Sequence, residues 1–306
     1  MSNVNAEQLL ARPSQPSLRR IMVTTDFSQH SRKAYAFAAR LAKQFKAKIH
    51  LVHFGSKKAQ EYSGITNVSH LKGLKNSLAK EVKHAAFADL EIETCVLERR
   101  DVGRSLSEYQ ENAGCDLIVT HTLSHQGFHR HFDHQLAEKI VACSTVPVLL
   151  FGPAAIDSGI DEPKSVLVPF DFSDKAAAAF PALRLLATQY RSSIKFLFVQ
   201  TIRCQWLYRL TGISTHKLET FEQRFKQLIN DELPNLDVEL EFVQGIPEYE
   251  LCNRVSGSNV DLIVIGTYGK LGNFTKSIIR QAKCPVLAVP TDREKETNLG
   301  WQMAIQ

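Results

Sequence analysis

Two segments of the sequence contain residues whose types and spacing could bind a ligand, and the first is a glycine-rich loop. Residues 266–273 read GTYGKLGN and place Gly266, Gly269 and Gly272 ahead of Asn273. Glycines let backbone N–H groups come close to phosphate oxygens, and a helix that starts after the last glycine adds partial positive charge. Such turns also occur for packing alone, so the loop leaves phosphate binding and an inherited, idle loop both open.

The second segment is rich in histidine. Residues 121–135 read HTLSHQGFHRHFDHQ and contain five of the eleven histidines of the chain. His121, His125 and His129 recur every four residues, but a zinc site needs three or four converging ligands and an irregular loop does not align them. The pattern favours surface histidines without a ligand. A metal site in the His121–His134 loop, and an anion bound by protonated histidines between about pH 5 and 7, are the alternatives.

The sequence contains an internal repeat, and the repeat indicates which structural elements position these residues. IMVTTDFSQHS at 21–31 matches VLVPFDFSDKA at 166–176, and DLIV at 116–119 recurs at 261–264, both with an offset of 145 residues. At the closing segments the offset falls to 138, because VPVLL contains Pro147 and CPVLA contains Pro285. The second copy has therefore lost seven residues between DLIV and its closing segment.

Each copy alternates short apolar runs with segments of helical spacing. The first copy has β-branched or apolar runs at 21–25, 48–54, 91–97, 116–120 and 146–151, and Ala34, Ala38, Leu41 and Phe45 lie on one helical face. Alternating strands and helices predict an α/β fold with a parallel sheet covered on both faces. Ligands of such folds bind beyond the carboxyl ends of the strands.

These motifs resemble the universal stress protein family, here as a tandem pair. The resemblance runs from Ile21 to Pro290 and depends on the DFS segment after the first strand, the DLIV strand, the glycine loop and the closing (C/V)PV segment. It implies two repeated five-stranded parallel-sheet domains of the Rossmann-like, adenine nucleotide alpha hydrolase-like type, at 19–153 and 163–291. It also implies that the domains pack as a pseudo-dimer and that some members bind ATP.

The family's binding pattern can be carried over to the second copy. The ATP-binding members of the family hold the adenosine part of ATP at the aspartate after the first strand. They surround its phosphates with a G-x2-G-x9-G-[S/T] loop. The resemblance then implies one site for ATP or another adenine nucleotide, and we expect adenine near Val199 and Ile265 and ribose at Asp171, which follows Pro169. The phosphates would meet Gly266, Gly269, Gly272 and Asn273.

The second copy departs from the pattern in its spacing. Only two residues separate Gly269 from Gly272, where the family's ATP binders have nine. A shorter loop covers less of a triphosphate, and Lys270 and Lys276 are candidates to replace the lost contacts with charge. A capping role of Asp171 for the next helix is the alternative to ribose binding.

The first copy has no glycines at the matching places. Counted back from Pro147, they fall on His121, Ser124 and His134, and the Ser/Thr position falls on Gln135. Arg100 and Val102 stand where the second copy has Gly245 and Pro247. The histidine segment is therefore a phosphate loop of full length whose glycines have been replaced.

No catalytic constellation is visible after either first strand. The segments TTDFSQHS and PFDFSDKA lack the HxGH and SGGxDS signatures of related nucleotide enzymes, and no pair of a magnesium carboxylate and a base is evident. We therefore expect a binding protein and not an enzyme, with weak ATP hydrolysis left open. An interaction scaffold without a nucleotide is the alternative function.

Composition sets the remaining expectations. With 306 residues, 44% hydrophobic and 23% charged, the chain suits two ordinary globular domains, and neither a membrane span nor a secretory signal is evident. The chain has a net charge of +5, but its basic residues do not form a cluster of arginines and aromatic residues. We therefore expect no nucleic acid partner. The six cysteines form no CxxC pair, which indicates a reducing compartment and a cytoplasmic protein.

Two expectations concern assembly. The closing strands VPVLLF and CPVLAV are apolar and would aggregate if left unpaired, so the halves should pack through them; a homodimer and an unnamed protein partner stay open. Residues 1–18 and those after Asp292 are polar and outside both repeats, and they should be poorly ordered or at the surface.

Overall fold

The structure, a computed structural model, describes residues 18–55, 67–122, 132–155, 159, 162–171, 173–200, 216–257, 259–269 and 271–291. Most of both terminal segments therefore lies outside the described residues. Leu18, which the sequence placed with the exposed N-terminal segment, is instead only 6% exposed. It is buried because it packs in the apolar core that also contains Phe37 and Leu41.

The first half alternates five strands with helices. Its strands are β1 (Arg20–Thr24), β2 (Lys48–Gly55), β3 (Ile92–Glu98), β4 (Leu117–His121) and β5 (Val148–Phe151). Its helices are α1 (Gln29–Phe45), α3 (Asn67–Glu81), α4 (Val102–Ala113) and α5 (Phe132–Cys143), with a short 3-10 turn η2 (Ala85–Phe87).

The second half repeats this order. Its strands are β6 (Ser165–Pro169), β7 (Ser193–Gln200), β8 (Asp237–Gln244), β9 (Leu262–Thr267) and β10 (Val286–Pro290). Its helices are α6 (Asp174–Ala177), α7 (Phe180–Tyr190), α9 (His216–Glu232), α10 (Pro247–Gly257) and α11 (Asn273–Gln281).

Helix α1 shows how the local sequence sets an element. The Ser28 hydroxyl caps it by accepting a hydrogen bond from the Ser31 backbone N–H at 3.1 Å. Lys46 ends it in the left-handed conformation, with φ of 54°. The predicted apolar face is confirmed, because Ala34, Ala38 and Leu41 are buried and Phe45 packs against the same core.

The second copy divides this helix in two. Pro181 stands in the first turn of α7, at the position that matches Ala36 in the middle of α1. A proline in a helix interior removes one backbone N–H and clashes with the preceding turn. The result is a four-residue helix, α6, followed by α7.

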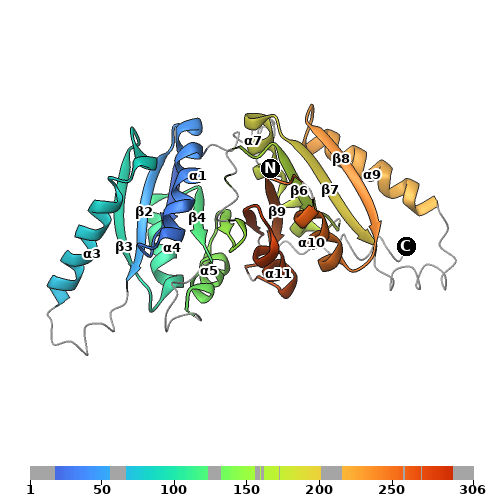
Figure 1. Ribbon diagram of the computed structural model, residues 1–306. Coiled ribbons are helices and arrows are strands. Elements are labelled where there is room, and N and C mark those ends of the chain that lie inside the picture. The colour runs from blue at the N-terminus through green and yellow to red at the C-terminus, as the bar shows by residue number, and fades with distance from the viewer. Residues whose placement is uncertain are drawn as a thin grey trace, which may run out of the picture.

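The ten strands form one sheet in the order β3-β2-β1-β4-β5-β10-β9-β6-β7-β8. Strands are parallel within each half, whereas β5 and β10 pair antiparallel, with Leu149 opposite Leu287. The expectation that the halves pack through their closing strands is thus confirmed. The two predicted five-stranded sheets are joined side by side (Figure 1).

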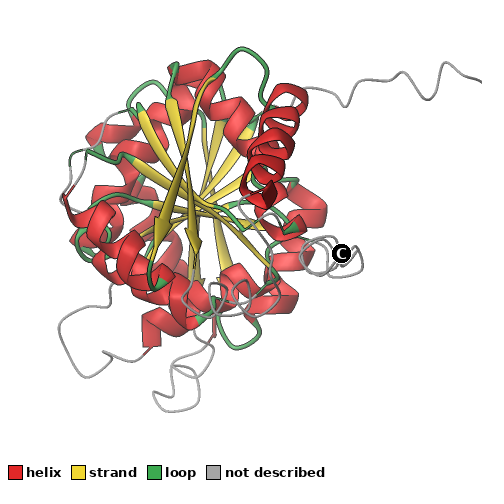
Figure 2. Ribbon diagram, turned by 90° about the vertical axis from the view of Figure 1, so that its right-hand side faces the viewer, coloured by secondary structure: helices red, strands yellow, loops and turns green. Residues whose placement is uncertain are grey.

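Helices cover both faces of this sheet, and each face has its own core. One core contains buried side chains of α1, α3, α7 and α9, and the other contains those of α4, α5, α10 and α11. Each core draws residues from both halves. Seen along the sheet, the twisted strands fan out between the helices (Figure 2).

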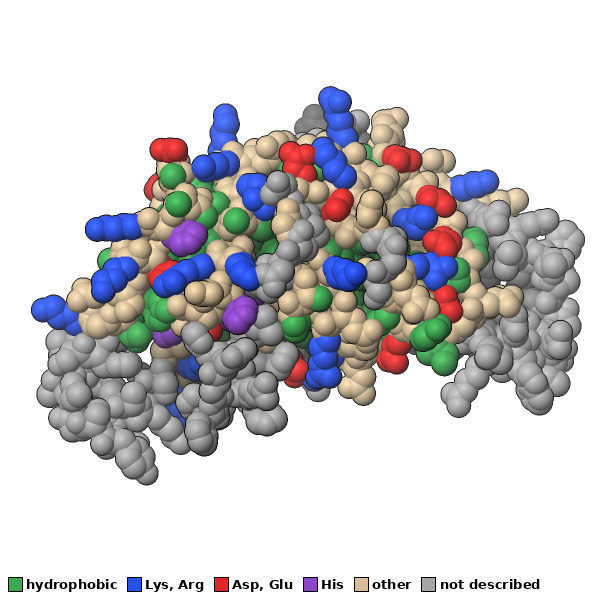
Figure 3. All heavy atoms as spheres, in the orientation of Figure 1, with side chains coloured by type: hydrophobic (Ala, Val, Ile, Leu, Met, Phe, Trp, Pro, Cys, Tyr) green, Lys and Arg blue, Asp and Glu red, His purple; other side chains and the backbone are tan. Residues whose placement is uncertain are grey.

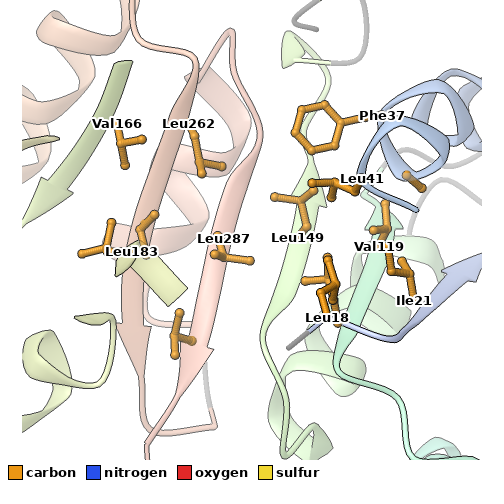
Figure 4. Close-up of a cluster of buried hydrophobic side chains, with 14 of the residues drawn as sticks. Leu18, Ile21, Phe37, Leu41, Val119, Leu149, Val166, Leu183, Leu262 and Leu287 are labelled. Carbon is orange, nitrogen blue, oxygen red and sulfur yellow. The ribbon is translucent and has the colours of Figure 1, made fainter. Parts of the chain in front are cut away.

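An apolar cavity of about 420 Å³ lies where the two halves meet, between α1 and α7. Phe37, Leu41 and Leu149 of the first half stand on one side of it, and Leu262 and Leu287 of the second half on the other (Figure 4). The junction is therefore apolar on this face of the sheet.

Charged side chains of both signs are intermixed on the molecular face seen in Figure 3. Within the described part of the chain, no helix combines the length and the apolar character that crossing a bilayer requires.

Candidate functional site

The carboxyl ends of the strands in the second half surround a cavity of about 550 Å³. Strands β6, β7 and β9 and the start of α10 all contribute to it, as expected for a parallel sheet with a ligand site at this edge. A cavity of this size suits a small ligand. The lining residues are Pro169, Phe170, Asp171, Ser173, Ala176, Leu197, Val199, Ile246, Pro247, Glu248, Leu251, Ile265, Gly266 and Phe274.

Five of the eight site residues expected from the sequence line this one cavity. They are Pro169, Asp171, Val199, Ile265 and Gly266. They come from three strands because the register of the sheet sets those strand ends beside one another; for example, Pro169 pairs with Leu197. The other three, Gly269, Gly272 and Asn273, belong to the loop and helix that follow β9.

Asp171 lies exposed at the rim of the cavity. Its Oδ1 accepts hydrogen bonds from the backbone N–H and the hydroxyl of Ser173, the former at 3.1 Å. The Ser173 hydroxyl oxygen in turn accepts from the Ala176 N–H at 3.2 Å. Ser173 therefore caps α6, and Asp171 orients that cap without occupying its position.

The floor of the cavity is apolar. Leu197, Ile265 and Leu251 are buried there, and Val199 is partly buried. Phe170 is held from below by Phe196 and Phe225, with ring centroids 5.2 and 5.7 Å away. Such a surface suits the flat face of an aromatic ligand.

Helix α11 starts beside the cavity and has no side-chain cap. Gly272 is its N-cap residue, with φ of −64°, and lacks a side chain that could accept from the first turn. A Cβ at this glycine would meet no atom within 4 Å, so the space beside Gly272 is open. Phe274, in the first turn, lines the cavity. The N–H groups of this turn, which have no partner within the helix, and the helix dipole provide one place for an anion.

The shortened loop before α11 packs against the first half. Gly269 has φ of +69°, and a Cβ there would lie 3.2 Å from the backbone oxygen of Ala142 at the end of α5. Leu271 is buried and lines a small gap together with Thr122 and Glu138. With seven residues fewer than its counterpart, the loop reaches α5 and not across the cavity.

Lys276 does not serve the role that the sequence suggested. Its Nζ lies 2.9 Å from Oε2 of Glu138 on α5, so it pairs across the junction of the halves. The reason is its position in the helix, one turn beyond Gly272, on the face that meets α5. Lys270, the other candidate, lies outside the described residues.

The corresponding edge of the first half contains a different arrangement. His121 stands where the second half has Gly266, and its side chain is 6% exposed. Its Nε2 lies 3.3 Å from Oδ1 of Asp26, the residue that matches Asp171. An imidazole thus bridges to the carboxylate across the space that Gly266 leaves open in the second half.

This contact changes the ionisation of Asp26. Burial raises its pKa, but the hydrogen bond and charge of His121 and the backbone N–H of Ser28 outweigh burial and hold the pKa well below the usual 3.8. The carboxylate of Asp26 therefore interacts with groups of the protein itself, whereas the carboxylate of Asp171 faces the cavity.

Two further side chains fill the same edge. Nδ1 of His53 lies 2.7 Å from the backbone oxygen of Thr25. Its ring lies against Phe27, with centroids 4.5 Å apart, and Phe27 adopts a left-handed φ of 65°. Protein side chains therefore take the place that a ligand would need, in line with the loss of glycines in the first copy.

The rest of the histidine segment is only partly described. His125, His129 and His131 lie outside the described residues, and His134 lies within α5. The sequence placed His134 at a helix-opening position; in the structure α5 already begins at Phe132, so His134 is its third residue. Over the described residues, no three His, Cys, Asp or Glu side chains converge as a metal site.

Nine of the lining residues were not among the site residues expected from the sequence, and they include Ser173, Ile246, Glu248 and Phe274. Ile246 and Glu248 flank Pro247, and the contrast of Gly245 and Pro247 with Arg100 and Val102 had already marked this loop. Phe274 directly follows the glycine loop, and its direction depends on where α11 begins.

Comparison with known proteins agrees with this arrangement. The model of the universal stress protein family matches residues 17–152 and again 163–290. A universal stress protein of Methanocaldococcus jannaschii is 28% identical over 152 residues, which are 41% of this chain and 94% of that protein.

Solved structures share the fold over most of the chain. A universal stress protein from Archaeoglobus fulgidus has a TM-score of 0.65 at 17% identity and covers 91% of this chain and 98% of its own. A functionally unknown protein from Pseudomonas aeruginosa has a TM-score of 0.56 at 15% identity, with 95% and 98% covered. Since the family model matches both halves, the chain belongs to the universal stress protein family, as a tandem pair of its domains.

Proposed function

We propose that this chain is a cytoplasmic stress-response protein that binds one adenine nucleotide, in its second half, and that it is not an enzyme. Membership of the family supports the stress-response part of the proposal. One observation supports nucleotide binding most strongly. A single cavity beside a helix N-terminus without a side-chain cap is lined by Pro169, Asp171, Val199, Ile265 and Gly266.

Each part of the cavity suits one part of a nucleotide. The apolar side chains of Val199 and Ile265 would contact the adenine, and Ile246, which is 63% exposed, would be covered by it. The carboxylate of Asp171 would accept hydrogen bonds from the ribose hydroxyls. A phosphate would lie before the first turn of α11, near Gly272.

The structure of the first half supports the proposal of one bound nucleotide per chain. There the Asp26–His121 pair and the Phe27–His53 contact occupy the matching space. A ligand would have to break this pair and leave the buried imidazole without its partner, which costs free energy.

Catalysis would need more than the cavity supplies. Hydrolysis of a phosphate requires a metal held by carboxylates and a base aimed at the attacking water. The acidic lining residues, Asp171 and Glu248, lie at the ribose rim and at the start of α10. We therefore propose binding without turnover, which a phosphate-release assay over hours tests.

A scaffold that docks a protein without a nucleotide is the second candidate. Ile246 and Tyr249 are the exposed large apolar side chains among the described residues, at 63% and 64%, and they are three residues apart at the start of α10. Titration with adenine compounds separates the two functions, because a scaffold would show no binding heat.

The decisive experiment is calorimetry on the wild type and two variants. Gly272→Val introduces a branched side chain where a phosphate would approach, and the free protein tolerates it because φ is −64° and the space is open. Losing two charge-assisted N–H contacts should weaken binding about a hundredfold. His134→Ala, at the matching count in the first half, should leave affinity and a stoichiometry of one unchanged. Two bound ligands, or a loss caused only by His134→Ala, contradicts the proposal.

A further inference from the structure

The charge of the second-half cavity limits which nucleotide it can take. Among the residues that the structure describes, the charged ones in its lining are Asp171 and Glu248, both acidic and both exposed. Like charges repel, and the repulsion is stronger near a protein surface than in bulk water. Each added phosphate carries further negative charge into the same region.

The loop after β9 gives little help to a second or third phosphate. Gly266 and Phe274 line the cavity, but Gly269 and Leu271 between them are turned towards α5. Lys276, the cation one turn into α11, is paired with Glu138 at 2.9 Å. Among the described residues, the anion-binding groups at the cavity thus reduce to one helix N-terminus.

One phosphate matches this arrangement. It would accept hydrogen bonds from the N–H groups of the first turn of α11, beside Gly272, where no described side chain caps the helix. Phosphates beyond it would leave the helix axis and lie in water or near the two carboxylates. The apolar floor and the ribose position do not depend on phosphate number.

We propose that this cavity selects a nucleoside or a nucleoside monophosphate over the di- and triphosphates. The proposal rests on the adenine-nucleotide function given above and adds the ligand class to it. The selection comes from the acidic mouth and from the loop that the seven-residue deletion turned towards the first half.

The test is a titration of the full chain with adenosine, AMP, ADP and ATP, each with EDTA and again with excess Mg²⁺. We expect the Kd to rise about three- to tenfold for each phosphate beyond the first. ATP binding as tightly as AMP, in either condition, overturns the proposed selection while leaving the nucleotide function standing. If none of the four compounds binds, the nucleotide function itself fails.

Two variants with equal changes of net charge test the cause. Glu248→Gln removes one carboxylate at the mouth and should reduce the ATP-to-AMP ratio of Kd about threefold. Asp231→Asn removes one exposed carboxylate near the end of α9, which leads into the amino end of β8, whereas the cavity lies at the carboxyl ends of the strands. This variant should leave the ratio unchanged. Equal ratios in the wild type and Glu248→Gln would contradict an electrostatic cause.

Discussion

At the scale of single residues, the two halves differ most at one pair of positions. Asp26 and Asp171 occupy the same turn and each accepts the backbone N–H of the serine two residues on. They differ in what stands opposite, which is His121 in the first half and Gly266 in the second. One imidazole in place of a glycine thus replaces an open cavity with an internal contact between the imidazole and the carboxylate.

This pair should contribute to stability in a pH-dependent way. The folded pKa of Asp26 lies below its usual 3.8, so its contribution is present above that pH and is lost as the pH falls towards the folded pKa. Asp26→Asn should lower the free energy of unfolding by about 1 kcal/mol near neutral pH. Urea unfolding should show this gap narrowing as the pH falls below about 4 and narrowing further towards the lower folded pKa.

Asp171→Asn is the matched control for this measurement. Its carboxylate accepts from Ser173 but faces the cavity and has Gly266 opposite. We expect a smaller loss of stability than for Asp26→Asn. Equal losses in the two variants would show that His121 contributes nothing.

At the scale of elements, the contact of β5 with α11 holds the halves in register. The chain leaves β5 at Gly152, where a Cβ would lie 1.8 Å from the backbone oxygen of Ile279 in α11. Only a glycine permits this approach of two backbones. The same surface carries the Lys276–Glu138 pair, which is partly exposed and therefore contributes little by itself.

A pair of glycine substitutions tests this contact. Gly152→Ala should destabilise the protein by about 2–4 kcal/mol, because the backbone of α11 must move. Gly73→Ala, in α3, meets no atom within 4 Å and should stabilise by up to about 1 kcal/mol through helix propensity. Thermal unfolding followed by circular dichroism measures both, and a neutral Gly152→Ala would show that the junction is loose.

At the scale of the whole molecule, the two domains behave as one structural unit. The sheet continues through β5 and β10, and each of the two cores contains side chains from both halves. The junction therefore buries surface that a separate domain would expose.

Separately produced fragments should show that each half depends on the other to cover its closing strand. Residues 1–153 alone leave the apolar edge of β5 unpaired, and residues 163–306 do the same for β10. An exposed apolar edge pairs with another strand, so each fragment should run at twice its mass in light scattering. A mixture should form the one-to-one complex. Fragments that stay monomeric and do not combine would rule out the junction as a source of stability.

Much of the fold was predictable because it depends on local pattern. The repeated order of apolar runs and the helical face of Ala34, Ala38 and Leu41 are set by periodicity, and the structure confirms them. Five of the eight expected site residues line one cavity because they end parallel strands. The carboxyl ends of parallel strands meet at one edge of the sheet whatever contacts their side chains make.

The sequence by itself determined the repeat, the α/β architecture, the missing glycines of the first copy and the missing seven residues of the second. Only the tertiary structure decided where the shortened loop points, that Lys276 pairs with Glu138, that His121 reaches Asp26 and that Glu248 and Phe274 face the cavity. The physical reason is that strands and helices follow from neighbours along the chain, whereas these contacts join residues far apart in sequence.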